Sequence, residues 1–341
     1  MRADPWGSAD APTAVRLRIG LPTIKGRSQR GGAPIPGPPP AGEAARPVLL
    51  PSPAMAPCPP DVATLRAELE ALIAAHDPAE RRAADPIAFP HRWPAGPDRE
   101  VVALYAALMA YGRADLIARA LSEVVPRMGP RPAEAAAGDD LEQARSRFAG
   151  VVYRFTRGED LARLWVGLGG LIRRHGTLGG AARHFDDRRS PDLRPLLIGL
   201  RAALMAPSDD LPARRGFRHL LADPGGSSAS KRWHMWLRWM VRGPDAIDFG
   251  DWRDLDPARL LMPVDTHVHR IGAFVGLTDR KTADLRCAEQ ITAALRRLCP
   301  EDPLRYDFAL AHLGISGRCP RRRVPAICVE CPIRRICSLP A

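Results

Sequence analysis

Apolar residues recur every three to four positions along most of this 341-residue chain. This spacing is typical of helices that bury one face. The first such segment follows Asp61, whose side chain is expected to cap the helix. The residues expected to share its buried face are Leu65, Leu69, Leu72 and Ile73.

Most of the remaining chain follows the same helical pattern. Asp98 is expected to cap an apolar helix that Gly112 ends. Further helices are predicted at about 114–127, 139–150, 159–174, 191–206, 213–221, 231–242, 265–275, 284–298 and 304–314. Because no run alternates as a strand would, the sequence predicts an all-α fold.

The first 60 residues break this pattern. They contain proline-rich runs, PIPGPPP at 34–40 and PSPAMAPCPP at 51–60, which cannot pack a core. The segment 1–60 is therefore predicted to be a disordered leader, or a flexible basic arm. Met55, just before the first helical segment, is an alternative translation start.

Composition narrows the functional classes. The formal charge of +12 is consistent with binding to nucleic acid or another anionic surface. No apolar stretch approaches the ~18 residues of a membrane span. Neither is there an apolar core of a secretory signal at the start. Clustering among the seven cysteines indicates a reducing, cytosolic setting.

Four cysteines lie close together in the last 23 residues: Cys319, Cys328, Cys331 and Cys337. A tight group of thiols usually holds a metal or an iron–sulfur cluster. One C-x2-C pair with long, unequal outer gaps favours a [4Fe-4S] cluster, and a structural zinc ion is the alternative. Arginines around the block suggest contact with phosphates, namely Arg318, Arg321, Arg322, Arg323, Arg334 and Arg335.

Lysine is rare here, with only Lys25, Lys231 and Lys281 in the chain. Lysine can lose its proton and act as a nucleophile, whereas arginine cannot. Lys231 begins a predicted helix, where the helix dipole and Arg232 both disfavour a further positive charge. Its amine is therefore a candidate nucleophile, and an ordinary solvated lysine is the alternative.

The turn before Lys231 is rich in glycine and serine. Successive backbone N–H groups in such a turn, together with the start of the next helix, can bind a phosphate. The turn residues that we expect to contact a nucleic-acid phosphate are Gly225, Gly226, Ser227, Ser228 and Ser230, followed by Arg232.

Asp265 occupies an N-cap position after Pro263. Capping is the simplest role, but a carboxylate there could also stabilise a positive sugar intermediate in a dry cleft. His267 and His269 follow, and most such histidines are structural. His267 is also a candidate for a base pocket, with Tyr111 and Arg113 from the end of an apolar helix.

Three tryptophans, Trp233, Trp236 and Trp239, recur every three residues after Lys231. They are expected to pack the core, with a stacking platform for bases as the alternative.

Three motifs follow one another in this chain. The first is the turn with Lys231, the second is Val264-Asp265-Thr-His-Val268 with Arg270, and the third is the group of four cysteines. In this order they resemble the helix-hairpin-helix base-excision DNA glycosylases, the superfamily of endonuclease III. The chain is still more similar to an uncharacterised bacterial branch at the edge of that superfamily, over about residues 61–337. The motifs that carry this similarity are Asp85-Pro-Ile-x-Phe89-Pro-His-Arg92, Ala110-Tyr-Gly-Arg113, Tyr153-Arg-Phe155, Lys231-Arg, Trp236-Leu-Arg-Trp-Met-Val-Arg242 and Tyr306-Asp-Phe-Ala-Leu310.

Two features depart from endonuclease III. The hairpin usually carries Gly-x-Gly shortly before its lysine, whereas this one is longer and serine-rich. The separation between Lys231 and Asp265 is also wider, and is similar to that of the archaeal 8-oxoguanine glycosylases. An oxidised base is therefore the substrate that the resemblance implies.

The resemblance implies a fold of two helical domains with a cleft between them. Residues 99–264 would form a helical barrel that ends in the hairpin. Residues 61–98 and 265–341 would form the second domain, closed by the cluster loop. Lys231 and Asp265 would then meet at the mouth of the cleft.

The activity implied is that of a monomeric, cytoplasmic, nucleoid-associated DNA glycosylase with AP lyase activity on damaged double-stranded DNA. Lys231 would attack the sugar and Asp265 would stabilise its positive charge. A nucleic-acid-binding protein that keeps the fold and cluster without catalysis is one alternative. A zinc-stabilised helical protein unrelated to repair is another.

Overall fold

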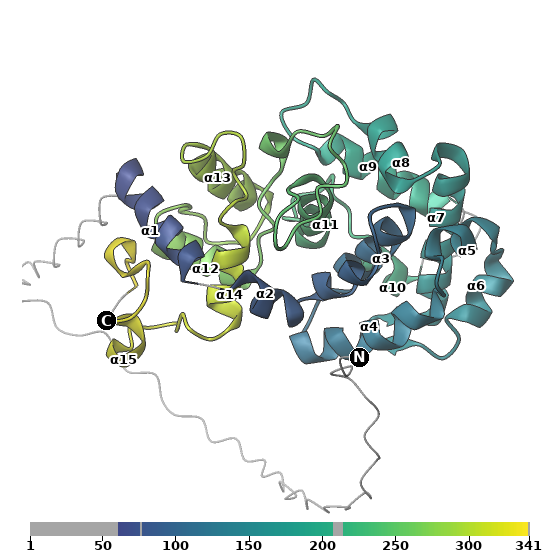
Figure 1. The fold of residues 1–341 in the computed structure, drawn as a ribbon, viewed down its shortest axis with the longest axis horizontal. Helices are drawn as coiled ribbons and strands as arrows, with labels where there is room; N and C mark the ends of the chain where they lie inside the picture. Colours follow the sequence, from purple (N-terminus) through teal and green to yellow (C-terminus); the bar gives the residue numbers. More distant parts are fainter. Residues whose placement is uncertain (1–60, 76, 207–213, 340–341) are drawn as a thin grey trace, which may run out of the picture. The chain divides into compact units, whose positions relative to one another are not determined.

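The computed structural model describes residues 61–75, 77–206 and 214–339, and these are mostly helical, with almost no strand (Figure 1). The all-α prediction is therefore confirmed for this part of the chain. The predicted leader of residues 1–60, with Met55, lies outside the described residues. Across the described ranges, no helix is both long enough and apolar enough to cross a membrane.

The elements follow one another along the chain with short connections. The first half contains α1 (Val62–Ala74), α2 (Pro78–Ala83), η1 (Pro86–Ala88), η2 (Pro90–Arg92), α3 (Pro97–Leu108), α4 (Ala114–Arg127), α5 (Pro132–Gly138), α6 (Leu141–Arg147), β1 (Val152–Tyr153), β2 (Thr156–Arg157) and α7 (Gly158–His175). The second half contains α8 (Leu178–Phe185), α9 (Arg194–Met205), α10 (Arg215–Leu220), α11 (Lys231–Val241), η4 (Pro257–Arg259), α12 (Thr266–Phe274), α13 (Leu285–Arg296), α14 (Asp307–Ile315), α15 (Pro325–Cys328) and η5 (Arg334–Ile336).

The cap predicted at Asp61 is present. Its Oδ1 accepts hydrogen bonds from the backbone N–H groups of Ala63 and Thr64, both at 3.0 Å. Because α1 begins there, Leu65, Leu69 and Leu72 fall on its buried face as the sequence predicts.

The cap predicted at Asp98 is wrong. Gly96 is the N-cap of α3, with a φ of 140° that suits glycine, and Pro97 takes the first helical position. Asp98 therefore lies in the first turn, where its Oδ1 accepts from the backbone N–H of Ala133 at 2.8 Å. The helix also ends at Leu108, well before the stop predicted at Gly112.

The periodic segments were easier to predict than the short ones. The helix predicted at 114–127 coincides with α4, but α2, α5 and α8 were missed. The sequence analysis also missed the small hairpin of β1 and β2, in which Val152 pairs with Arg157 and Tyr153 with Thr156. A two-residue strand is too short to produce a visible alternation.

The centre of the fold is α11, which packs against α3. Trp233, Trp236 and Trp239 on this helix are each no more than 1% exposed, so the prediction that they pack the core is confirmed. Later in the chain, α12 packs against α14, and α1 packs against α14 and η5. Elements from both ends of the described sequence thus pack against α14.

Candidate functional site

The start of α11 is set by the turn that precedes it. Ser230 adopts a left-handed conformation, with a φ of 44°, and its hydroxyl donates to the backbone oxygen of Asp223 at 3.3 Å. The backbone oxygen of Ser227 accepts from Leu285 at the start of α13, at 2.9 Å. The first hydrogen bond joins the two ends of the turn and the second holds its middle, and Lys231 is the first residue of the helix that follows.

Asp265 meets Lys231 from the N-terminus of α12. Its Oδ1 accepts from the backbone N–H groups of His267 and Val268, both at 2.9 Å, which confirms the predicted cap. Its Oδ2 lies 3.7 Å from Nζ of Lys231. One oxygen thus fixes the carboxylate on the helix, and the other faces the amine.

Lys231 and Asp265 line a cavity of about 30 Å³ between α11, α12 and α14. This volume accommodates one or two water molecules. It is much smaller than a nucleobase. The residues that line it are Asp85, Lys231, Met235, Arg238, Trp239, Pro263, Asp265, Asp307, Phe308, Ala311, His312 and Ile315.

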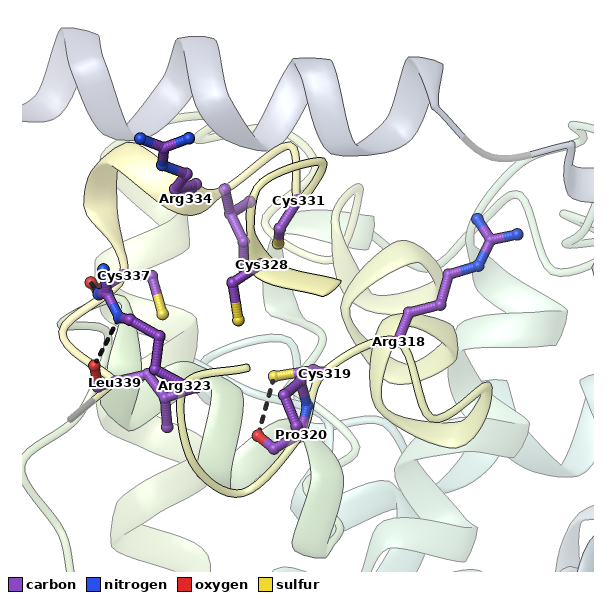
Figure 2. A pocket seen from close by; sticks show the side chains of 10 residues that line it. Arg318, Cys319, Pro320, Arg323, Cys328, Cys331, Arg334, Cys337 and Leu339 are labelled. Carbon is purple, nitrogen blue, oxygen red and sulfur yellow. Dashed lines mark hydrogen bonds between the residues drawn. The ribbon is translucent and has the colours of Figure 1, made fainter. Parts of the chain in front are cut away.

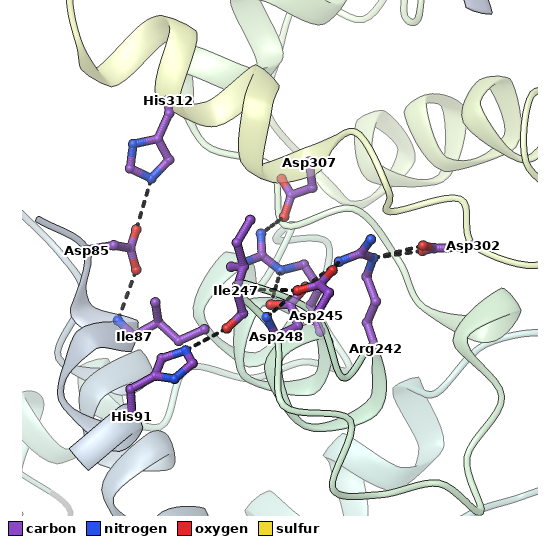
Figure 3. A network of polar contacts seen from close by, with 11 residues as sticks. Asp85, Ile87, His91, Arg242, Asp245, Ile247, Asp248, Asp302, Asp307 and His312 are labelled. Atoms are coloured by element: carbon purple, nitrogen blue, oxygen red, sulfur yellow. Dashed lines mark hydrogen bonds and ion pairs between the residues drawn. The ribbon is translucent and has the colours of Figure 1, made fainter. Parts of the chain in front are cut away.

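Arg238 and Asp307 of this cavity belong to a buried network of charges, and Figure 3 shows its contacts. Arg238 of α11 donates from Nε to Asp248 at 3.1 Å and from Nη1 to Asp307 of α14. Burial alone would lower the pKa of Arg238, but the two carboxylates outweigh it and raise the pKa above its usual value. Arg242 extends the network to Asp302, with Nε 2.9 Å from the carboxylate.

Four charged or titratable residues of this cavity, Asp85, Arg238, Asp307 and His312, were not predicted as site residues. Three of them stand inside the motifs that carry the resemblance, in Asp85-Pro-Ile, Trp236-Leu-Arg238 and Tyr306-Asp307. The motifs include these three residues but predict no chemical role for them. His312 lies in none of these motifs, and it reaches the cavity through the packing of α14.

Tyr111 belongs to a different cluster. Its hydroxyl lies 3.1 Å from the backbone oxygen of Tyr153 and 2.8 Å from Oγ1 of Thr156. Burial raises the pKa of Tyr111 above its usual value. Its ring stacks edge-on against His219, with 4.7 Å between ring centroids. Tyr111 is not among the residues that line the cavity of Lys231.

Two more candidates for a base pocket also lie outside the cavity lining. Arg113 is exposed and pairs with Asp115 at 3.0 Å. His267 packs against Gly314 of α14 so closely that a Cβ at Gly314 would lie 2.5 Å from that of His267. Glycine at position 314 therefore permits the close approach of α12 and α14.

The turn residues divide into an exposed and a buried part. Gly225, Gly226, Ser227 and Ser228 are exposed, whereas Ser230 is buried. Arg232 turns inward and donates to the backbone oxygens of Leu108 and His219. Burial lowers the pKa of Arg232 to about 10.

The four clustered cysteines line one cavity of about 20 Å³ (Figure 2). All four thiols are free of disulfide bonds. Within the described ranges, no three histidine, cysteine or acidic side chains lie close enough together to hold a metal ion as they stand. An all-thiol donor set around one cavity nonetheless suits an iron–sulfur cluster or a zinc ion, which are both bound by four cysteines in other proteins.

The cysteine segment is attached to the helices beside the candidate site. Arg270 of α12 donates to the backbone oxygen of Cys319 at 2.9 Å. Ser338 donates from its backbone N–H to the oxygen of Phe274 at 2.8 Å. Arg321, Arg322 and Arg323 are exposed on this segment, and Arg323 also donates to the backbone oxygen of Leu339 at 3.3 Å.

Comparison with protein families gives one match. Residues 85–316 match the family described as "Protein of unknown function (DUF2400)", and the chain belongs to this family. No curated protein matches the chain. The matched region contains Lys231, Asp265 and all the charged residues of their cavity, and ends just before Cys319.

Proposed function

We propose that this protein is a DNA glycosylase with AP lyase activity, which removes an oxidised base from double-stranded DNA. The observation that carries the proposal is the pairing of Lys231 and Asp265. They are 34 positions apart in the chain, yet Nζ and Oδ2 lie 3.7 Å apart at the N-termini of two helices. An amine beside a fixed carboxylate that can accept its proton suits Schiff-base chemistry.

In the proposed mechanism the damaged nucleotide is turned out of the duplex to reach these groups. Oδ2 of Asp265 stabilises the positive sugar as the bond between C1′ and the base breaks. It also helps to remove a proton from Nζ of Lys231. The free amine bonds to C1′, and loss of water or opening of the sugar ring gives the Schiff base.

The proposed partner is the phosphate backbone, bound by the turn before α11 and by the cysteine segment. Gly225, Gly226, Ser227 and Ser228 are exposed and offer backbone groups. Arg321, Arg322 and Arg323 supply positive charge on the other segment. We further propose a monomer that acts on the nucleoid in the cytoplasm.

The fold proposed with this function is the two-domain helix-hairpin-helix fold, with α10, the turn and α11 as the hairpin. Cys319, Cys328, Cys331 and Cys337 would hold a [4Fe-4S] cluster, or a structural zinc ion as the alternative. When bound, such a group ties together a segment that has no helix longer than four residues between Arg318 and Leu339. Its role in this proposal is structural.

One observation favours a second function, a nucleic-acid-binding protein without catalysis. The cavity beside Lys231, at about 30 Å³, is smaller than a base, so catalysis requires α11 and α14 to separate or the base to approach from outside. If neither occurs, the protein would bind nucleic acid through its basic surfaces alone.

Borohydride trapping on a duplex with one abasic site tests the proposed function. The wild-type protein should form a covalent adduct, because borohydride reduces the Schiff base. Lys231→Gln should form none, since the amine is lost. Asp265→Asn should slow trapping by about 100-fold, yet leave thermal stability nearly unchanged because asparagine is also a good N-cap.

A wild-type protein that gives no adduct, or a Lys231→Gln variant that gives an equal one, would remove Lys231 from this role. Lys281→Gln is the matched control, because Lys281 is exposed and lies outside the cavity lining. It should trap at the wild-type rate.

The cofactor is tested by anaerobic purification and metal analysis. We expect about four iron and four acid-labile sulfide per chain, with a brown colour. Cys331→Ser should lose most of the iron, whereas Cys299→Ser, outside the four-cysteine cavity, should keep it. Stoichiometric zinc without iron would instead support the zinc alternative.

A further inference from the structure

A histidine and an aspartate form a pair in the cavity of Lys231. Nε2 of His312 on α14 lies 3.3 Å from Oδ2 of Asp85, and both side chains are mostly buried. Oδ1 of Asp85 accepts from the backbone N–H of Ile87 at 3.0 Å (Figure 3). The carboxylate is thus held on one side and presents its other oxygen to the imidazole.

The ring of His312 is also fixed on its face. Phe308, one turn earlier on α14, lies with its ring centroid 4.1 Å from that of His312. With Nε2 on Asp85, the proton sits on Nε2 and leaves Nδ1 as the acceptor. Nδ1 has no hydrogen-bond partner among the residues that the structure describes.

Asp85 is a carboxylate at neutral pH, as it must be to accept a hydrogen bond from the imidazole of His312. Its burial would raise its pKa, but the hydrogen bonds from His312 and from the backbone of Ile87 outweigh burial, and the pKa lies below its usual range. A carboxylate at neutral pH orients an imidazole and stabilises it when it gains a proton, as in catalytic triads.

The other charged groups around the cavity are already engaged. Asp265 caps α12 with one oxygen and faces Lys231 with the other. Arg238 binds Asp307 and Asp248. The titratable and charged groups that face this cavity or pack against α14 beside it are Asp85, Lys231, Arg238, Asp265, His267 and Asp307. His267 also has a ring nitrogen without a hydrogen-bond partner, but this Nδ1 is buried, and His267 packs against Gly314 outside the cavity lining. His312 is the imidazole that lines the cavity itself.

We infer that His312, oriented by Asp85, is the base that removes a proton from C2′ of the sugar once Lys231 holds C1′ as a Schiff base. This inference rests on the proposed function. The C2′–H bond breaks and its electron pair forms the C2′=C3′ double bond. The C3′–O bond breaks at the same time, and the phosphate leaves with the electrons of that bond. The proton ends on Nδ1 of His312.

The proposed reaction has two stages that require different residues. Schiff-base formation needs Lys231 and Asp265, whereas strand cleavage also needs His312. A variant at His312 should therefore accumulate the Schiff base. A pair that only joins α14 to η1 would affect both stages equally, through stability.

The test measures both stages in single-turnover reactions on a duplex with one abasic site, from pH 5.5 to pH 8.5. His312→Gln should form the borohydride adduct at a rate within about threefold of wild type, but cleave the strand about 100-fold more slowly. Asp85→Asn should cleave about 10-fold more slowly, with the rising limb of its pH profile shifted to lower pH. This shift follows because a histidine without its carboxylate is a weaker base.

His269→Gln is the matched control. His269 is half-buried on α12 and its Nε2 lies 2.8 Å from the backbone oxygen of Arg280, outside the cavity. It should leave trapping, cleavage and the pH profile unchanged.

Two outcomes would overturn the inference. One is a His312→Gln variant that cleaves at the wild-type rate with the wild-type pH profile. The other is an equal loss of trapping and cleavage in both Asp85→Asn and His312→Gln, which indicates a structural role. If the wild-type protein itself forms no adduct, the proposed function fails, and this inference fails with it.

Discussion

His234 is a buried histidine on α11, 1% exposed, with no hydrogen-bond partner for either ring nitrogen. Burial lowers its pKa to about 4, although Asp192 acts in the opposite direction. A neutral, unpaired imidazole in the core costs stability whenever the unfolded chain can bind a proton instead. This loss of folding free energy comes from His234 and its buried surroundings alone.

The pH dependence of stability should reveal this residue. Between pH 6.5 and pH 4 the unfolded state binds a proton at His234 that the folded state does not, so stability falls as pH falls. The loss between pH 7 and pH 5 is about 2 kcal/mol. His234→Leu should remove this part of the slope when urea unfolding is measured at both pH values.

His184→Leu is the control for this measurement, because His184 is exposed on α8. Its slope between pH 7 and pH 5 should change less than that of His234→Leu, because the replacement acts only through the neighbouring His175, whose pKa is lowered by burial and, less strongly, by His184. An unchanged slope in His234→Leu would show that His234 is protonated in the folded protein.

At the scale of the element, α7 depends on two neighbouring glycines with opposite surroundings. A Cβ at Gly169 would lie 1.9 Å from the backbone oxygen of Ala136, so α5 and α7 touch through this residue. A Cβ at Gly170 would meet only the end of Arg173, at 4.0 Å. The two positions share a helix and differ only in what they face.

Alanine at these two positions should have opposite effects on stability. Gly169→Ala should destabilise the protein by about 1–3 kcal/mol or more, because backbone must move to accept the methyl group. Gly170→Ala should stabilise it by about 0.5–1 kcal/mol through helix propensity. Urea unfolding of the two variants beside wild type measures both, and equal effects would contradict the packing of α5 on α7.

At the scale of the whole molecule, the arginines behind the net charge of +12 differ in whether they form ion pairs within the protein. Several exposed arginines are already paired with an acid three or four residues away, such as Arg131 with Glu134 at 2.6 Å and Arg119 with Asp115 at 3.6 Å. Arg321 and Arg322 are exposed on the cysteine segment, and no ion pair is found for them among the described residues. Charge that is not neutralised within the protein is available to phosphates.

Salt dependence of DNA binding should separate these two sets of arginines. The double variant Arg321→Ala/Arg322→Ala should reduce the slope of log Kd against log salt by about 2, since each lost phosphate contact removes about 0.9. Arg119→Ala/Arg131→Ala removes the same formal charge from paired positions and should leave the slope nearly unchanged. Equal slopes in the two double variants would place DNA binding elsewhere.

Local rules of sequence predicted much of this structure. The caps at Asp61 and Asp265, the helix at 114–127 and the start of α11 at Lys231 each depend on a few neighbouring residues. The cap at Asp98 was wrong because Gly96 and Pro97 together start α3 earlier. Short elements such as α5 and β1 escaped because they span too few residues to show a period.

The sequence by itself determined the helical class, the caps at Asp61 and Asp265, and the identity of the amine and the carboxylate as candidates. Only the tertiary structure decided what surrounds them. Asp85 comes from the start of η1, Arg238 from α11, and Asp307 and His312 from α14, and these elements line the cavity together with the start of α12. Helix periodicity and capping act within one or two turns and are therefore visible in sequence, whereas convergence of distant side chains depends on packing between helices.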